Sequence, residues 1–338
     1  MRQLLILAIS SLMMACAHAA PPAQATPDEI EIVGAPEEPQ APLTIPEQPA
    51  ALVAALKKLQ EGSLDAQVKA LVEKARQDMV YVEGGEFLMG DFGHLDSVEK
   101  LPYTSQPYNK PLHKVVLDSF SISKYKVTYA EYDVYTKAKG LPLILQDDVY
   151  LKYRAPNVPA GVPWQGAKDY CAWLGKASKL PFNLPTEAQW EYAARARGQL
   201  LVFPTNDGYY REDVNVPSYE ARTKLAGHQR EIYPIGLYPP NPIGLYDLAS
   251  NGRDWMNDWF SETAYREPEP HKNPIGSLKG TEKVIRGLVS TDRDTAMSMF
   301  RRKQEPFTKP YEASGIMVRP SYIGDAFRCA LQQPKAIH

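Results

Sequence analysis

Cysteine and histidine are scarce in this chain, and their positions restrict its chemistry. Among 338 residues there are three cysteines and six histidines, the latter at His18, His94, His113, His228, His271 and His338. No two histidines have the i, i+4 spacing of a helical ligand pair, and only His94 and His113 flank one loop. A Gly-x-Ser-x-Gly elbow and a Gly-rich phosphate loop are also absent. These absences argue against a histidine metal centre and against nucleophilic or phosphate chemistry built on those motifs.

An excess of charge of one sign is lacking as well. Lys and Arg number 38 against 40 Asp and Glu, for a net charge of -2. This balance gives no reason to expect nucleic acid as a partner. Proline, in contrast, is abundant, with 30 residues against a usual share of about 5%. Together with a hydrophobic share of 44%, this composition indicates a globular core with many turns and no doubly wound sheet.

The first residues have the pattern of an export signal. Arg2 supplies a positive start, an apolar run extends from Leu4 to Met14, and Ala17-His18-Ala19 is a cleavage site of the A-x-A type. We predict a signal peptide over residues 1–19 and therefore an exported protein. The alternative is a lipoprotein signal with Cys16 as the acylated residue. No second apolar segment of membrane-spanning length follows.

Composition divides the rest of the chain into three segments. Residues 20–49 are rich in Pro and Ala, which predicts an extended or disordered leader. Residues 50–78 have apolar side chains at helical intervals, broken at Gly62, and Ser63 is a candidate N-cap. We predict one or two amphipathic helices there, which either pack on the main domain or bind a partner. The main domain is placed at residues 79–332.

Two cysteines remain once Cys16 is assigned to the signal region. Cys171 and Cys329 form an even pair in a protein that enters an oxidising compartment. We therefore predict a disulfide between them, with two buried free thiols as the alternative.

Residues 244–260 concentrate a turn, a polar loop and two tryptophans. Trp255 and Trp259 would share one face of a helix, because they are four residues apart. Asn251 and Asp254 place side-chain oxygens beside a turning backbone. Ca²⁺ prefers carboxylate, amide and main-chain oxygens, so this loop is a candidate calcium site. The alternative is a set of polar residues that cap the backbone.

Several motifs occur in the order found in a known protein family. Thr128 and Thr186 are candidate helix N-caps, and Gln189 occupies the capping-box position after the second. The motifs read Glu83-Gly-Gly-Glu-Phe-Leu-Met-Gly90, Leu184-Pro-Thr-Glu-Ala-Gln-Trp190, Ser250-Asn-Gly-Arg-Asp-Trp255, Ile285-Arg-Gly287 and Ala326-Phe-Arg-Cys-Ala330. In this order they resemble the formylglycine-generating-enzyme (sulfatase-modifying factor) family. The resemblance implies an α+β fold, irregular and C-type-lectin-like, with low regular secondary structure.

The resemblance also implies binding residues. A disulfide-linked pair of the family matches Cys171 and Cys329. One loop that binds a structural Ca²⁺ ion in the family matches Asn251, Gly252 and Asp254. The start of a second calcium loop matches Asn215 and Val216, although the residues that follow have diverged.

The family's oxygenase chemistry depends on two cysteine thiols that bind copper, shortly after the Arg-Gly element. In this chain residues 286–300 contain no cysteine. Thiolates are the ligands that Cu(I) requires, and no hydroxyl or carboxylate replaces them. We therefore expect no copper and no formylglycine formation. The histidine cluster of the iron-dependent sulfoxide synthases, another branch of the family, is missing too.

A scaffold without its catalytic pair points to a binding role. Two inserted segments, residues 140–163 and the basic segment of residues 291–320, carry aromatic and basic residues, which are typical anchors of protein interfaces: Tyr150, Tyr153, Arg293, Phe300, Arg301 and Arg302. For the basic segment, a solvated loop over the former active-site cleft is the alternative.

Among exported, non-catalytic members of the family, the chain most resembles a periplasmic regulator of type VI secretion. That resemblance implies activation of the threonine-phosphorylation pathway through the periplasmic region of the membrane kinase PpkA. The system includes the outer-membrane lipoprotein TagQ. Two alternatives remain, namely a periplasmic enzyme of the same fold with a different chemistry and a glycan-binding module.

Overall fold

The computed structural model describes residues 43–226, 232–267, 270–288, 293–308, 311–313, 316–318 and 322–337. The predicted signal peptide, Cys16 and most of the predicted leader lie outside the described residues. Residues 43–338 belong to one unit. No helix among the described residues has both the length and the apolar character needed to cross a bilayer.

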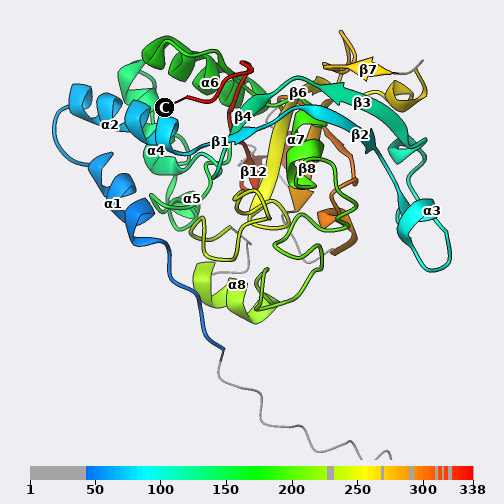
Figure 1. Ribbon diagram of the computed structural model, residues 1–338. Coiled ribbons are helices and arrows are strands. Elements are labelled where there is room, and N and C mark those ends of the chain that lie inside the picture. Colours follow the sequence, from blue (N-terminus) through cyan, green and yellow to red (C-terminus); the bar gives the residue numbers. More distant parts are fainter. Residues whose placement is uncertain are drawn as a thin grey trace, which may run out of the picture. The chain divides into compact units, whose positions relative to one another are not determined.

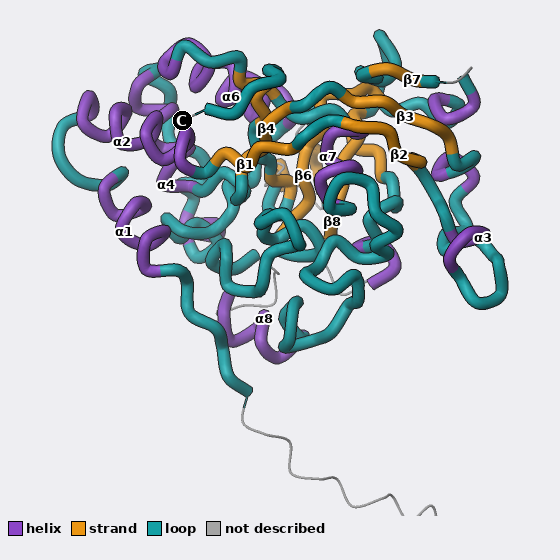
Figure 2. The backbone as a smooth tube through the Cα atoms, viewed as in Figure 1, coloured by secondary structure: helices purple, strands orange, loops and turns teal. Residues whose placement is uncertain are grey.

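Short helices and short strands alternate with long loops, as Figure 2 shows. The α-helices are α1 (Ala50–Lys58), α2 (Leu64–Gln77), α3 (Gly93–Asp96), α4 (Tyr129–Ala138), α5 (Asp148–Leu151), α6 (Trp164–Ser178), α7 (Glu187–Ala194) and α8 (Tyr219–Ala226). Short 3₁₀ helices are η1 (Pro107–Asn109), η2 (Ala264–Arg266) and η3 (Arg293–Ala296). The predicted fold class, an irregular α+β fold with little regular structure, is confirmed.

The strands are β1 (Met79–Val82), β2 (Gly85–Met89), β3 (His113–Leu117), β4 (Phe120–Ser123), β5 (Phe182–Asn183), β6 (Gly252–Trp259), β7 (His271–Lys272), β8 (Lys283–Leu288), β9 (Arg302–Gln304), β10 (Tyr311–Ala313), β11 (Ile316–Val318), β12 (Asp325–Ala326) and β13 (Ala330–Leu331). They form sheets of order β1-β4-β13-β5, β2-β3-β7 and β12-β6-β8-β9, and β10 pairs with β11. β1 and β2 follow one another but join different sheets. The chain bends at Gly84, where a Cβ would meet the carbonyl oxygen of Leu117 at 2.3 Å.

The predicted helices over residues 50–78 are present and pack on the main domain. Ser63 caps α2 by accepting a hydrogen bond from the Ala66 N–H at 3.3 Å. Leu56 and Leu71 are buried in the same hydrophobic core as residues of α4 and α6. The four helices lie together on one side of the domain in Figure 1. Their apolar faces are therefore buried in the domain and are not available to bind a partner.

The two predicted N-caps are confirmed. Thr128 and Glu131 form a complete capping box at the start of α4. Thr186 and Gln189 form another at the start of α7. Every residue of α7 is buried, and the indole of Trp190 is fully enclosed. This helix is the centre of the domain, with strands packed around it (Figure 1).

The segment with the two tryptophans is a strand and not a helix. Residues 252–259 form β6, which pairs with β12 on one side and with β8 on the other. Trp255 is buried, and the register shifts between Trp255 and Trp259. The indole spacing fitted a helix, but two neighbouring strands satisfy the backbone of this segment and decide its conformation.

The predicted disulfide is present. Cys171 of α6 and Cys329, just before β13, are joined with their Cα atoms 5.8 Å apart, and both side chains are fully buried. The bond ties α6 to the last strands of the domain.

Candidate functional site

A cluster of buried charges joins α7 to the chain around β8 and β9. Glu187 accepts hydrogen bonds from Arg286 Nη1 at 2.8 Å and from Arg301 Nε and Nη2 at 2.8 and 2.9 Å. Glu191 accepts from Arg286 Nη2 at 2.9 Å and from Arg195 Nη1 at 3.0 Å. Burial alone would raise the pKa of Glu187, but Arg301 and Arg286 outweigh it and hold that pKa below its usual value. These ion pairs are a structural device inside the domain.

The cluster corrects the prediction for Arg301. Its side chain is 1% exposed and is fully engaged by Glu187 and by main-chain carbonyls, such as that of Tyr108. A guanidinium in this position cannot anchor a partner on the surface. The basic segment therefore divides between the core and the surface.

The other predicted interface residues are more accessible. Arg293 is exposed in η3, and its guanidinium lies 5.3 Å from the ring centroid of Phe203. The remaining predicted anchors are half-buried: Tyr150, Tyr153, Phe300 and Arg302. Phe307, in the same basic segment, is an apolar side chain that is 58% exposed.

The loop predicted to bind calcium through Asn251, Gly252 and Asp254 has other partners. Asn251 accepts a hydrogen bond from the Tyr233 N–H at 2.9 Å and donates to the Tyr233 carbonyl at 3.0 Å. Its φ of +60° and that of Gly252, +95°, make the turn before β6. The amide oxygen of Asn251 is thus committed to the backbone.

Asp254 is neutralised by two cations from elsewhere in the chain. Its Oδ2 lies 3.0 Å from Lys126 Nζ and 2.9 Å from Arg328 Nε, and it accepts the Trp190 indole N–H at 3.0 Å. All of these side chains are fully buried. Burial lowers the pKa of Lys126 to about 8, against the pull of Asp254. A dication beside Lys126 and Arg328 would be repelled, so these residues do not fit a calcium ion.

The second predicted loop gathers oxygens around Asn215. Its Nδ2 donates to Asn206 Oδ1 at 3.0 Å, to Asp207 Oδ1 at 3.1 Å and to the Tyr209 carbonyl at 3.1 Å. The carbonyl of Val216 accepts from the Asp213 N–H at 2.6 Å. Carboxylate, amide and main-chain oxygens within one short loop are the donor set that Ca²⁺ prefers. Asn215 Oδ1 accepts from the Arg211 N–H at 2.9 Å, and Arg211 Nη1 lies 3.4 Å from Asp207 Oδ2 at the surface. The Asn206, Asp207 and Tyr209 oxygens still converge on one point, and calcium binding there stays a prediction.

No thiol in the described part of the chain is available as a ligand, because Cys171 and Cys329 are oxidised to the disulfide. Of the segment expected to correspond to the copper site, residues 289–292 lie outside the described residues. Within the described ranges there is also no group of three or more His, Cys, Asp or Glu side chains placed to hold a metal ion.

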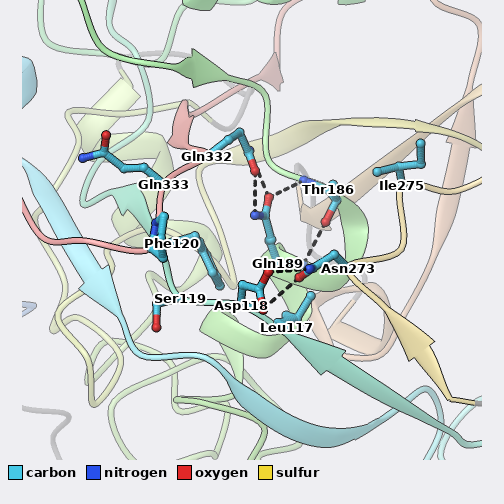
Figure 3. Close-up of a pocket in the computed structure, with 11 residues that line it drawn as sticks. Leu117, Asp118, Ser119, Phe120, Thr186, Gln189, Asn273, Ile275, Gln332 and Gln333 are labelled. Carbon is cyan, nitrogen blue, oxygen red and sulfur yellow. Dashed lines mark hydrogen bonds between the residues drawn. The ribbon is translucent and has the colours of Figure 1, made fainter.

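A pocket of about 270 Å³ lies between α7, β7 and the end of the chain (Figure 3). Its polar groups pair with one another. Gln189 and Gln332 exchange amide hydrogen bonds of 2.9 and 3.2 Å, and Asn273 donates to Asp118 at 2.8 Å. These groups brace the termini of strands and leave little free hydrogen-bonding capacity for a ligand.

A larger cavity, of about 410 Å³, lies next to this pocket, because Asn273 and Ile275, which follow β7, line both the pocket and the cavity. Its walls include His113 of β3, Glu187 of α7, Asp258 of β6, Tyr265 of η2 and His271 of β7. We call it the histidine-lined cavity. The rings of His113 and Tyr265 are 4.2 Å apart between centroids, and those of His113 and His271 are 5.0 Å apart.

Asp258 and Tyr265 are buried polar groups in this cavity. Burial, followed by the negative charge of Glu187, raises the pKa of Asp258 to about 7. Burial also raises the pKa of Tyr265 well above its usual value, and the Tyr265 hydroxyl has no hydrogen-bond partner in the part of the chain that the structure describes. Sequence patterns did not predict this site, because its residues come from five separate elements. His113 contacts His271 here, while His94 lines a different pocket.

Comparison with known proteins shows where such a scaffold occurs. The family described as "Sulfatase-modifying factor enzyme 1-like domain" matches residues 66–318. Over 231 residues the chain is 32% identical to the serine/threonine-protein kinase pkn1 of Chlamydia pneumoniae, a match that covers 62% of this chain and 32% of that protein. It therefore spans about a third of the length of this relative.

Two further relatives match over most of their length. The formylglycine-generating enzyme of Streptomyces coelicolor is 29% identical over 306 residues, covering 76% of this chain and 90% of that enzyme. The solved structure of PvdO from Pseudomonas aeruginosa superposes with a TM-score of 0.55 at 26% identity, covering 75% of this chain and 94% of PvdO.

Proposed function

Since the chain belongs to the family of sulfatase-modifying factor enzyme 1-like domains, we propose that it is a non-enzymatic member that acts by binding. The role we propose is that of a periplasmic regulator of type VI secretion, similar to TagR. It would promote activation of the threonine-phosphorylation pathway by contact with the periplasmic region of the kinase PpkA, in a system that includes TagQ.

The cysteine inventory is the observation that carries this proposal. The family's oxidation chemistry uses copper held by thiolates, and the whole chain has three cysteines. Two are consumed by the buried disulfide, and Cys16 lies in the predicted signal peptide. The domain thus keeps the scaffold and lacks the ligands, which favours a binding role.

The likeness to pkn1 supports a link to kinases. That relative is named as a serine/threonine-protein kinase, and about a third of its length resembles this chain. A domain of this family therefore occurs within a protein named as a kinase. In this chain the same kind of domain would act on a kinase in trans.

Mechanistically, the braced domain would present the exposed part of the basic segment to its partner. Arg293 is an accessible cation of this segment and Phe307 an accessible apolar side chain. Guanidinium and aromatic groups are typical interface anchors. Binding of these groups to one conformation or dimeric form of the partner would shift the partner's equilibrium towards it.

The test is crosslinking capture of the periplasmic region of PpkA by the mature protein, with mass spectrometry of the captured chains. Arg293→Glu should lower capture by roughly tenfold or more, because a desolvated charge contact is worth more than a kcal/mol. Lys58→Glu, an exposed charge reversal in α1, is the control and should capture normally. Failure of the wild-type protein to capture the kinase refutes the regulatory role. Normal capture by Arg293→Glu refutes only the basic segment as the contact surface.

We also propose that any structural calcium ion lies in the Asn215 loop. Addition of millimolar CaCl₂ after chelation should then raise the Tm of the wild-type protein, because an ion that binds only the folded state stabilises it. Asp207→Asn removes the carboxylate of this loop and should abolish that rise. Asp147→Asn, an exposed carboxylate in a different loop, is the control.

A periplasmic enzyme of the same fold with different chemistry is the second candidate. The histidine-lined cavity favours it, because ionisable groups with shifted pKa values gather at catalytic sites. Turnover of a small-molecule substrate that is lost on Asp258→Asn would support this candidate over the regulatory one.

A further inference from the structure

The histidine-lined cavity contains buried polar groups that the proposed regulatory role does not use. Asp258 is 3% exposed, and the Glu187 N–H donates to its Oδ2 at 3.0 Å. Among the described residues Asp258 has no other hydrogen-bond partner and no cation in an ion pair with it. Tyr265 is 4% exposed, and its hydroxyl has no partner within the same described ranges. A buried hydroxyl without a partner is unfavourable unless a ligand or water supplies one.

The charges around the cavity select the kind of ligand. The carboxylate of Glu187 is already matched by Arg286 and Arg301. Asp258 and the exposed Glu267 are the further carboxyl groups of the wall, and Lys272 on the exposed rim is its one lysine. Arg301 and Lys283 also act on Asp258 but form no ion pair with it among the described residues. A cation would meet the ionised form of Asp258 in a partly desolvated setting, where charge-assisted hydrogen bonds are strong.

The aromatic wall suits the same ligand. The ring of His113 contacts those of Tyr265 and His271, and together they give an aromatic surface. The Arg301 guanidinium already lies 4.2 Å from the centroid of the Tyr265 ring, so this surface serves the alkyl part of a ligand. A volume of about 410 Å³ is within the range of small-molecule sites.

Asp258 lies near one end of the β6–β8 ladder, where Trp259 pairs with Lys283, and Leu288 pairs with Gly252 at the other end. Glu187 of the cavity wall also accepts a hydrogen bond of 2.8 Å from Arg286, which belongs to the segment of residues 286–300.

We propose that the histidine-lined cavity binds an organic cation with an ammonium or guanidinium group, held by the Asp258 carboxylate and the Tyr265 hydroxyl. The cation is either a free small amine or a basic side chain of another protein. This inference does not depend on the regulatory role.

Isothermal titration calorimetry on the mature protein tests it, with agmatine as the free cation and acetyl-Gly-Arg-Gly-amide as the side-chain probe. Butylurea, which is neutral but keeps N–H donors and an alkyl chain, is the ligand control. Agmatine or the peptide should bind roughly tenfold or more tightly than butylurea, as expected for a charge-assisted contact. Binding of the peptide identifies a protein side chain as an accepted source, and binding of agmatine alone identifies a free amine.

Two variants locate the binding. Asp258→Asn keeps the shape and an acceptor for the Glu187 N–H, and it should weaken cation binding by roughly tenfold or more. Tyr265→Phe should weaken it by a smaller factor, and Asp147→Asn should leave it unchanged. Equal affinity for agmatine and butylurea overturns the proposal even if Asp258→Asn fails to fold. Undiminished cation binding by a folded Asp258→Asn protein, or no binding of either cation by the wild type, overturns it as well.

Discussion

Lys126 is the most informative single position in the core, because its ammonium is fully buried beside Asp254 and Arg328. Burial lowers its pKa to about 8 from the ordinary value of 10.5. Between these two values the unfolded chain binds a proton that the folded protein does not hold. Stability therefore rises with pH in this window, and the penalty for burying the charge is fully present below pH 8. Lys126→Met removes the titrating group and keeps a similar volume.

The magnitude follows from the two pKa values. A shift of this size corresponds to about 3 kcal/mol in total, of which about 2 kcal/mol is recovered between about pH 7 and pH 9.5. The free energy of unfolding of the wild-type protein should thus rise by about 2 kcal/mol relative to Lys126→Met over this range. Other titrating groups, including Lys283, are common to both proteins and cancel in the difference.

Urea unfolding of both proteins at several pH values across this range measures the difference. Lys69→Met, which removes an exposed lysine of α2, is the control and should show no such slope relative to the wild type. A pH-independent difference between the wild type and Lys126→Met would mean that Asp254 fully compensates the ammonium. In that case the reasoning about desolvation at this site would be wrong.

Two further predictions concern the other braces of the domain. Replacing both Cys171 and Cys329 by Ser should lower the free energy of unfolding in urea by about 2–5 kcal/mol, because the disulfide closes a loop with a sequence separation of 158; reductant should then have no additional effect, and an unchanged midpoint would contradict a stabilising bond. Arg301→Met should lower the free energy of unfolding by about 3–5 kcal/mol, because the buried Glu187 carboxylate loses a partner. Arg293→Met at the surface should change it by less than about 1 kcal/mol. Similar losses of stability for the two variants in thermal or urea unfolding would refute the division of the basic segment into a buried and an exposed part.

Local sequence signals predicted those features that depend on residues close together in the chain. Ser63, Thr128 and Thr186 were recognisable as N-caps because a cap is satisfied within three residues. The disulfide was predictable from the cysteine count and the export signal. The histidine-lined cavity was not, because the partners of Asp258 and His113 are set by which strands become neighbours. The pattern of residues along the chain does not say which strands pair with one another.

The error at Arg301 has a physical cause that the sequence could have revealed. Arg301 was predicted to bind a partner because clustered arginines and aromatic side chains are typical interface anchors, with a solvated loop as the alternative. Yet α7 carries Glu187 and Glu191 one turn apart on a helix that is buried on all sides. Two carboxylates in such a helix require buried cations, since an unpaired internal charge is strongly destabilising. Arg195, Arg286 and Arg301 are those cations. Once a helix is recognised as central, its acidic residues therefore predict that nearby arginines lie inside the domain, and the surface available to a partner shrinks accordingly.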